Sequence, residues 1–276
     1  MTKPDLRLAI HGDVPNSFWQ ELKRQLEECY RRLPTSDLEV VQVCLLDTVK
    51  RLRQFLAAEH AELGIASPLG EEFLALHDAW HGVPRITICH ERLAGVPHLV
   101  GLGAIRQQVA HSILHGSPEY YVFKFSRNLV EKGQERGLAP AALQQLLYYV
   151  AIAVKDYEVV RLLVTHGYVD CQAALAFHQL EADDEDRLAW RLARLNPVVR
   201  LICLASQLKC MLSIRPLVAK PALASALIQQ ARAMLSFLPL EEQDKLWALT
   251  QQIAAALGDD THQNIATALQ LTLEIL

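Results

Sequence analysis

Long apolar runs are missing from this chain of 276 residues. The nearest candidate, 146–154, is about half the length that a membrane-spanning helix needs and runs directly into Lys155 and Asp156. The first residues, Met-Thr-Lys-Pro-Asp, contain no apolar leader segment. We therefore expect no membrane partner and a cytoplasmic location.

Basic charge and metal-binding cysteine pairs are also scarce. The formal net charge is −4, with no basic stripe, which argues against a nucleic-acid-binding protein. The six cysteines are scattered through apolar segments, and none forms a Cys-x-x-Cys pair, so we expect buried free thiols. P-loop, dinucleotide-binding and nucleophile-elbow motifs do not occur. These absences remove several common enzyme classes from consideration.

The remaining pattern predicts an α+β fold with strands first and helices afterwards. Short apolar runs predict strands at 6–10, 40–46, 73–80 and 84–90, helices at 16–33 and 47–64, and a loop at 93–97. Helices are expected at 99–115, 139–165, 171–180, 184–195, 197–213, 221–237, 240–257 and 260–275. We expect a small N-terminal mixed sheet with helices in a domain of residues 1–170. A helical C-terminal domain of residues 171–276 follows, with a candidate hinge at 215–221.

One predicted helix carries a distinctive pattern of polar residues. Side chains four residues apart are neighbours on a helix surface. Gln107, His111 and His115 therefore form one column, and Gly116 provides a C-terminal stop. Two histidines at this spacing can bind one metal ion, as in the His-Glu-x-x-His motif of zinc peptidases. His77 and His81 have the same spacing but fall in an expected strand, so we assign them no role.

The segment from His111 to Phe123, preceded by the strand at 84–90, resembles the active-site region of zincin-type metallopeptidases. The motif has two possible registers, either Gln107-Gln108-Val-Ala-His111 or His111-Ser112-Ile-Leu-His115. The family's catalytic glutamate, which activates the metal-bound water, is replaced by Gln108 in the first register and by Ser112 in the second. Both registers therefore imply that ordinary zincin proteolysis is disfavoured.

The resemblance also suggests where a third ligand would come from. In the gluzincin branch an acidic residue on a later helix completes the zinc site, and Asp156 or Glu158 on the apolar helix at 139–165 has a suitable spacing. The expected metal set is thus His111, His115 and one of these carboxylates, with Zn²⁺ as the metal. The alternative is that the carboxylates belong to internal ion pairs or an exposed helix end.

Three functional readings follow from these residues. The first is a degenerate zincin-like metallopeptidase homologue with a binding or structural role toward an unknown protein or peptide, in which a residual metal site can remain. The second is an active metal-dependent hydrolase whose base lies outside the helix motif, either Glu119 or a carboxylate of the helix at 139–165. Its candidate catalytic residues are Gln108, which stands at one of the two base positions, Glu119, and Tyr120, which could stabilise an oxyanion. The third is a metal-free helical interaction protein. The alanine- and leucine-rich C-terminal helices are also candidates for homo-oligomer formation.

Overall fold

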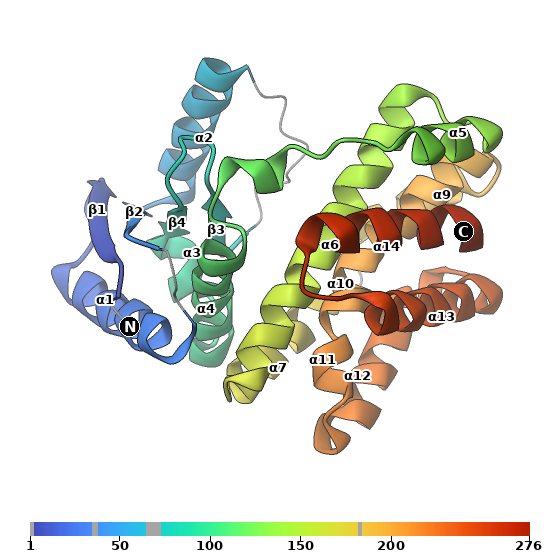
Figure 1. Cartoon of the computed structure of the whole chain (residues 1–276). Helices are drawn as coiled ribbons and strands as arrows, with labels where there is room; N and C mark the ends of the chain where they lie inside the picture. Colours follow the sequence, from blue (N-terminus) through green and yellow to red (C-terminus); the bar gives the residue numbers. More distant parts are fainter. Residues whose placement is uncertain (1–2, 35–37, 65–72, 182–183) are drawn as a thin grey trace. The chain divides into compact units, whose positions relative to one another are not determined.

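The structure, a computed structural model, describes residues 3–34, 38–64, 73–181 and 184–276. Within these residues the fold is α+β, with a small mixed sheet near the N-terminus and helices afterwards, as predicted (Figure 1). The chain forms two compact units. The first consists of Met1–Tyr121 and His166–Leu175, and the second of Val122–Thr165 and Ala176–Leu276. The expected boundary after residue 170 therefore lies inside a segment that returns to the first unit.

Four strands form the sheet of the first unit, within its described residues. They are β1 (Asp5–His11), β2 (Val40–Leu46), β3 (Ala75–Asp78) and β4 (Arg85–Cys89). The order is β1-β2-β4-β3, in which β1, β2 and β4 are parallel and β3 runs antiparallel to β4. β4 is buried at every position, as expected for a strand covered on both faces. Strand β3 lies at the edge of the sheet, and the predicted site helix contacts it more extensively than it contacts β4.

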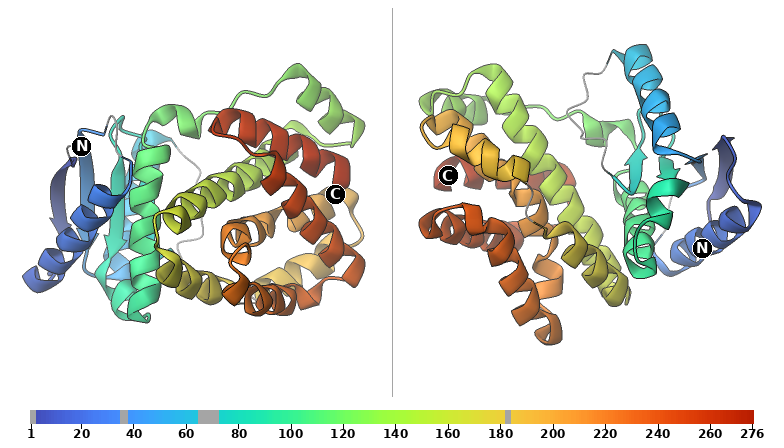
Figure 2. Two further views of the ribbon diagram at one scale, coloured as in Figure 1. Left: turned by 60° about the horizontal axis from the view of Figure 1, so that its bottom comes forward. Right: turned by 180° about the vertical axis from the view of Figure 1, so that it is seen from behind.

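The helices of the first unit cover both faces of this sheet. They are α1 (Asn16–Arg32), α2 (Val49–Leu63), α3 (His90–Ala94) and α4 (His98–Leu114), followed by a short 3-10 turn η1 (Pro118–Tyr121). Leu52 and Leu56 of α2 pack with Leu46 and Cys89 of the sheet. α1 and α4 contact each other on the other face (Figures 1 and 2). The predicted site helix is thus an interior element of its unit.

The turn after β1 depends on a glycine and a neighbouring carboxylate. Gly12 has a φ of +93°, and a Cβ atom there would lie 2.0 Å from the Asp47 carboxylate. That carboxylate accepts a hydrogen bond from the Asp13 amide at 3.0 Å and another from the Thr48 amide at 2.7 Å. The His-Gly-Asp sequence of this turn is therefore explained by backbone geometry.

The second unit is helical throughout its described residues. Its helices are α5 (Arg127–Glu135), α6 (Pro140–Thr165), α8 (Asp184–Ala193), α9 (Pro197–Ser206), α10 (Leu208–Ser213), α11 (Arg215–Val218), α12 (Pro221–Met234), α13 (Leu240–Ala256) and α14 (Thr261–Ile275), with a 3-10 turn η2 (Leu235–Phe237). Helix α7 (Val169–Gln179) begins in the first unit and ends in the second. The long apolar helix α6 contacts α9, α10, α11 and α14, so it is the central helix of this unit (Figure 1).

Several local predictions were wrong. The expected loop at 93–97 begins inside helix α3, and the helix expected at 197–213 is divided into α9 and α10 at Gln207. The candidate hinge at 215–221 contains helix α11, whose first turn includes Pro216. Helix α5, begun by the Ser126 side chain accepting from the Leu129 amide, was not predicted. All four differences concern helices of ten residues or fewer, for which periodicity gives little signal.

Membrane-spanning potential is limited in the described part of the chain. No single helix there is both long and apolar enough to count as a candidate span. Helices α5 and α6 meet the length and composition criteria only as a pair, with a bend of 114° between them.

Candidate functional site

Most residues of helix α4 are buried. Gly103 permits close approach of the segment that begins α7, because a Cβ at this position would lie 2.5 Å from the Cys171 carbonyl oxygen. The apolar positions Ile105 and Val109 are buried, as expected. The polar side is largely buried as well, because Gln107, Gln108, Ser112 and His115 are buried and His111 is half-buried. The polar side of α4 therefore faces mostly protein.

The column predicted from the helical spacing divides into two parts. Gln107 Nε2 donates to Gln172 Oε1 at 3.1 Å, and Gln172 Nε2 donates to the Gly103 carbonyl at 3.2 Å. Gln107 is thus engaged with α7. One turn further along, His111 Nδ1 and His115 Nδ1 lie 3.1 Å apart and share a hydrogen bond. The two histidines form a direct pair, while Gln107 belongs to a structural contact.

Aromatic residues from two other elements surround this pair. The His77 ring on β3 stacks on the His111 ring, with centroids 6.0 Å apart and planes 8° from parallel. The Tyr121 hydroxyl bonds His77 Nδ1 at 3.0 Å, and the Tyr120 ring lies edge-on to His115 at 5.4 Å. We call these five residues, His77, His111, His115, Tyr120 and Tyr121, the histidine–tyrosine cluster. It joins β3, the last turn of α4 and η1 within the first unit.

Sequence reasoning missed His77. Its side chain is buried, and the strand pairing sets it opposite Ile86 of β4, the strand that precedes the site helix. The spacing of His77 and His81 suggested a pair between themselves, whereas the partner of His77 comes from α4. Burial raises the pKa of Tyr121 above its ordinary value, so its hydroxyl stays protonated in the bond to His77. The available signal was a histidine within an apolar segment expected to be a strand, because a polar side chain that is buried in a strand needs a partner.

The positions that would carry a catalytic glutamate have structural partners. Ser112 Oγ donates to the Val109 carbonyl at 2.7 Å and lies 2.7 Å from the Tyr30 hydroxyl on α1. Gln108 Nε2 donates to the Ala104 carbonyl of its own helix at 3.3 Å. Both side chains are used within the fold.

The two nitrogens of the histidine pair are spaced much like two metal ligands, but they share a hydrogen bond with each other and are only two in number. Two nitrogens bound tetrahedrally at about 2.0–2.1 Å from zinc lie about 3.3 Å apart, close to the spacing of the pair. A catalytic zinc ion takes three protein ligands. Among residues 3–34, 38–64, 73–181 and 184–276, no group of three or more His, Cys, Asp or Glu side chains is arranged to hold a metal ion. The described donor set therefore fits a partial chelate.

The predicted carboxylate ligands lie on α6 in the second unit, whereas the histidines belong to the first. Glu158 is buried, and its two oxygens accept hydrogen bonds from Asn264 Nδ2 at 2.6 Å and Thr261 Oγ1 at 2.8 Å. These bonds fasten the start of α14 to α6. Nearby on α6, burial lowers the pKa of Lys155 to about 8, against the charges of Asp156 and Glu158. Glu158 thus has a structural role in its own unit, and a metal role for either carboxylate stays a prediction.

The catalytic candidates outside α4 differ in their surroundings. Glu119 is exposed on η1 and accepts a hydrogen bond from Ser117 Oγ at 3.0 Å. Tyr120 is half-buried and touches His115. Of these two, Tyr120 therefore belongs to the cluster by direct contact.

Comparison with protein-family models, with curated proteins and with solved structures gave no match for this chain.

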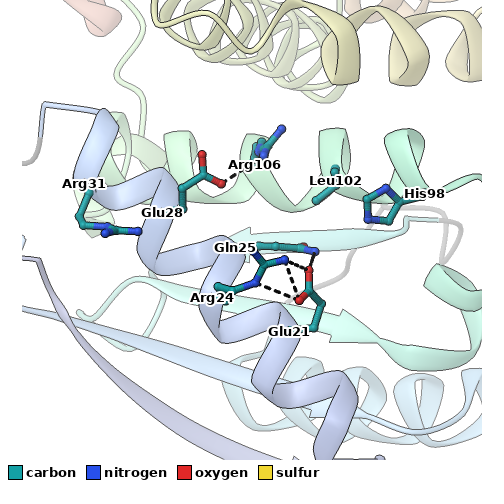
Figure 3. A pocket seen from close by; sticks show the side chains of 8 residues that line it. All are labelled: Glu21, Arg24, Gln25, Glu28, Arg31, His98, Leu102 and Arg106. Atoms are coloured by element: carbon teal, nitrogen blue, oxygen red, sulfur yellow. Dashed lines mark hydrogen bonds and ion pairs between the residues drawn. The ribbon is translucent and has the colours of Figure 1, made fainter.

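A separate polar pocket of about 300 Å³ lies between α1 and α4 (Figure 3). It is lined by Glu21, Arg24, Gln25, Glu28, Arg31, His98, Leu102 and Arg106. Arg24 donates to both oxygens of Glu21, and Arg106 lies 3.5 Å from Glu28. Four of its charges are thus paired with each other, and none of its lining residues belongs to the histidine–tyrosine cluster. The pocket is a polar groove between two packed helices.

Proposed function

We propose that this chain is a degenerate zincin-like metallopeptidase homologue that does not cleave peptides and acts in binding or structure toward a protein or peptide. The observation that carries the proposal is the contact between Ser112 and Tyr30. The residue at one of the two base positions is fixed inside the unit, and the other, Gln108, bonds its own helix. Neither residue type accepts a proton from water at neutral pH.

The order of elements supports the zincin-like part of the proposal. Strand β4 precedes the site helix in the chain, as in the family that the sequence resembles. The histidine pair lies in the last turn of that helix, beside the edge strand β3. A strand, a helix and two histidines four residues apart are thus present together.

The chemistry of the cluster supports the loss of peptidase activity. The family that the sequence resembles uses a glutamate to activate the metal-bound water. The cluster contains imidazoles and tyrosine hydroxyls but no carboxylate among its five members. Any zinc ion would be held at His111 and His115 by two nitrogens, and such a partial site binds more weakly than a three-ligand one. Bound zinc would supply Lewis acidity there.

The experiment uses protein purified without a histidine tag. We expect no cleavage of casein and less than one equivalent of zinc by elemental analysis. Any rise in melting temperature on adding zinc should disappear in His111→Ala and His115→Ala, because they remove the chelating nitrogens. His98→Ala is the matched control, since this exposed histidine lies at the other end of the same helix.

Two results of these experiments would contradict our expectations. Casein cleavage by the wild type that His111→Ala abolishes and His98→Ala preserves would establish an active hydrolase. A full equivalent of zinc that survives dialysis and is lost in His111→Ala would instead show a complete metal site. The first outcome overturns the proposal, and the second overturns the expectation of a partial metal site.

A further inference from the structure

Helix α8 and the turn after it expose three leucines to solvent. The exposed fractions are 56% for Leu188, 71% for Leu192 and 86% for Leu195. Leu188 and Leu192, four residues apart, lie on one side of α8, and Leu195 lies in the turn that follows its last residue, Ala193. We call these three residues the α8 stripe. Val199, in the first turn of α9, is also 45% exposed.

The opposite side of the same helix is well packed. Trp190 and Ala193 are buried, and α8 contacts α9 and η2 within the second unit. Gln207 of the unit also donates to Asp186 at 3.0 Å. α8 is therefore held in place by one side, and the α8 stripe is a second apolar side. Exposed apolar rows with a polar border are typical of protein interaction surfaces.

The charged residues beside the α8 stripe are acidic at the start of the segment 184–195 and basic after that. Asp184, Glu185 and Asp186 occupy the first turn. Arg187, Arg191 and Arg194 follow, each directly before a leucine of the stripe. Three acidic and three basic residues leave this segment without net charge. It is acidic at one end and basic at the other.

This arrangement favours a particular occupant. An antiparallel copy of the same helix would bring the acidic first turn of each α8 against the arginines near the end of the other. A parallel copy would bring like charges together. A wholly acidic or wholly basic partner would meet repulsion at one end. The surface is thus complementary to itself under a two-fold axis.

We propose that the α8 stripe is a self-association surface on which two copies of the chain pair through antiparallel α8 helices. The leucines form the dry centre, and the carboxylate–arginine pairs lie at its rim. A single helix pair is smaller than the roughly 1,200–2,000 Å² of a stable standard interface. The dimer is therefore weak, and its population rises with protein concentration.

The test is sedimentation velocity of the full chain over a wide concentration range. The wild type should shift from monomer toward dimer, and Leu192→Glu should weaken association about tenfold or more. Leu240→Glu is the matched control, because Leu240 is 75% exposed at the start of α13 and lies outside the stripe. Circular dichroism of each variant confirms that helix content is retained. A wild type that is monomeric at every concentration would sink the proposal.

Charge exchange tests the antiparallel geometry. One variant carries Asp184→Arg with Glu185→Arg, and a second carries Arg191→Glu with Arg194→Glu. Each alone should self-associate more weakly than the wild type, and a variant with all four changes should recover because complementarity is restored. Weakening of the first two without recovery in the fourfold variant, or no effect of any exchange, overturns the antiparallel pairing.

Discussion

The hydroxyl groups of Tyr30 and Ser112 lie 2.7 Å apart in the buried contact between α1 and α4. Because Ser112 donates to the Val109 carbonyl, the hydroxyl of Tyr30 is the donor between the two. Burial raises the pKa of Tyr30 above its ordinary value, which keeps this hydroxyl protonated. A position that would hold a catalytic glutamate in a working zincin is here a hydrogen-bonded joint between two helices.

A glutamate placed at this joint should damage the fold without creating a base. Ser112→Glu would bury a carboxylate in a space fitted to a serine, so we expect the free energy of unfolding to fall by more than about 2 kcal/mol. Casein cleavage should stay absent. Urea unfolding measures the first effect, and a peptide digestion assay measures the second.

The joint can also be measured by a double-mutant cycle. Tyr30→Phe and Ser112→Ala should each cost about 1–2 kcal/mol, and the double variant should cost less than their sum because both remove the same bond. Additive costs would mean that the two hydroxyls do not interact.

For Ser112→Glu, the contrary outcome is wild-type stability together with new hydrolysis. That outcome would show that the side chain at position 112 reaches an active site.

The sequence patterns predicted the helix and strands of the site, but they did not predict which residues of different elements contact each other. The pairing of His111 and His115 follows from local helix geometry, and the seven residues of β2 follow from a β-branched run. The contact of His77 with His111 joins a strand to a helix, so no local spacing encodes it. The partner of Gln107 lies 65 residues later, on a segment that returns to the first unit after α6. These contacts depend on tertiary topology.

The glycines of α4 provide a matched pair for testing that returning segment. Gly103→Ala would place a methyl group 2.5 Å from the Cys171 carbonyl and 2.9 Å from the Leu175 Cβ. We expect the free energy of unfolding to fall by about 1–3 kcal/mol, because α4 and α7 must move apart to admit the methyl group. The methyl group of Gly101→Ala would lie 3.5 Å from Leu93 Cδ2 and 3.9 Å from Val96 Cγ2, which are ordinary contacts. It should stabilise the chain by up to about 1 kcal/mol through helix propensity.

Chemical unfolding of both variants provides the measurement. Hydrogen exchange at the start of α7 should quicken in Gly103→Ala and stay unchanged in Gly101→Ala. Equal stability of the two variants would contradict the close packing of α7 on α4.

Acid should remove the contribution of Asp47 to the turn after β1. The Asp13 amide, the neighbouring Arg51 and the Thr48 amide lower the pKa of Asp47 from 3.8 to about 2, against the opposing effect of burial. A carboxyl whose pKa is lower in the folded state stabilises the fold fully above its unfolded pKa. That stabilisation should decline as the pH falls from about 4 and should vanish below about 2. Asp47→Asn should therefore weaken the fold at pH 7, and the difference in free energy of unfolding from the wild type should shrink through this window.

Urea unfolding between pH 7 and pH 2 measures this difference in free energy of unfolding. Asp5→Asn, a largely exposed carboxylate on β1, is the control for loss of one charge. A difference for Asp47→Asn that stays constant from neutral pH to pH 2 would show that the carboxylate bonds do not stabilise the turn.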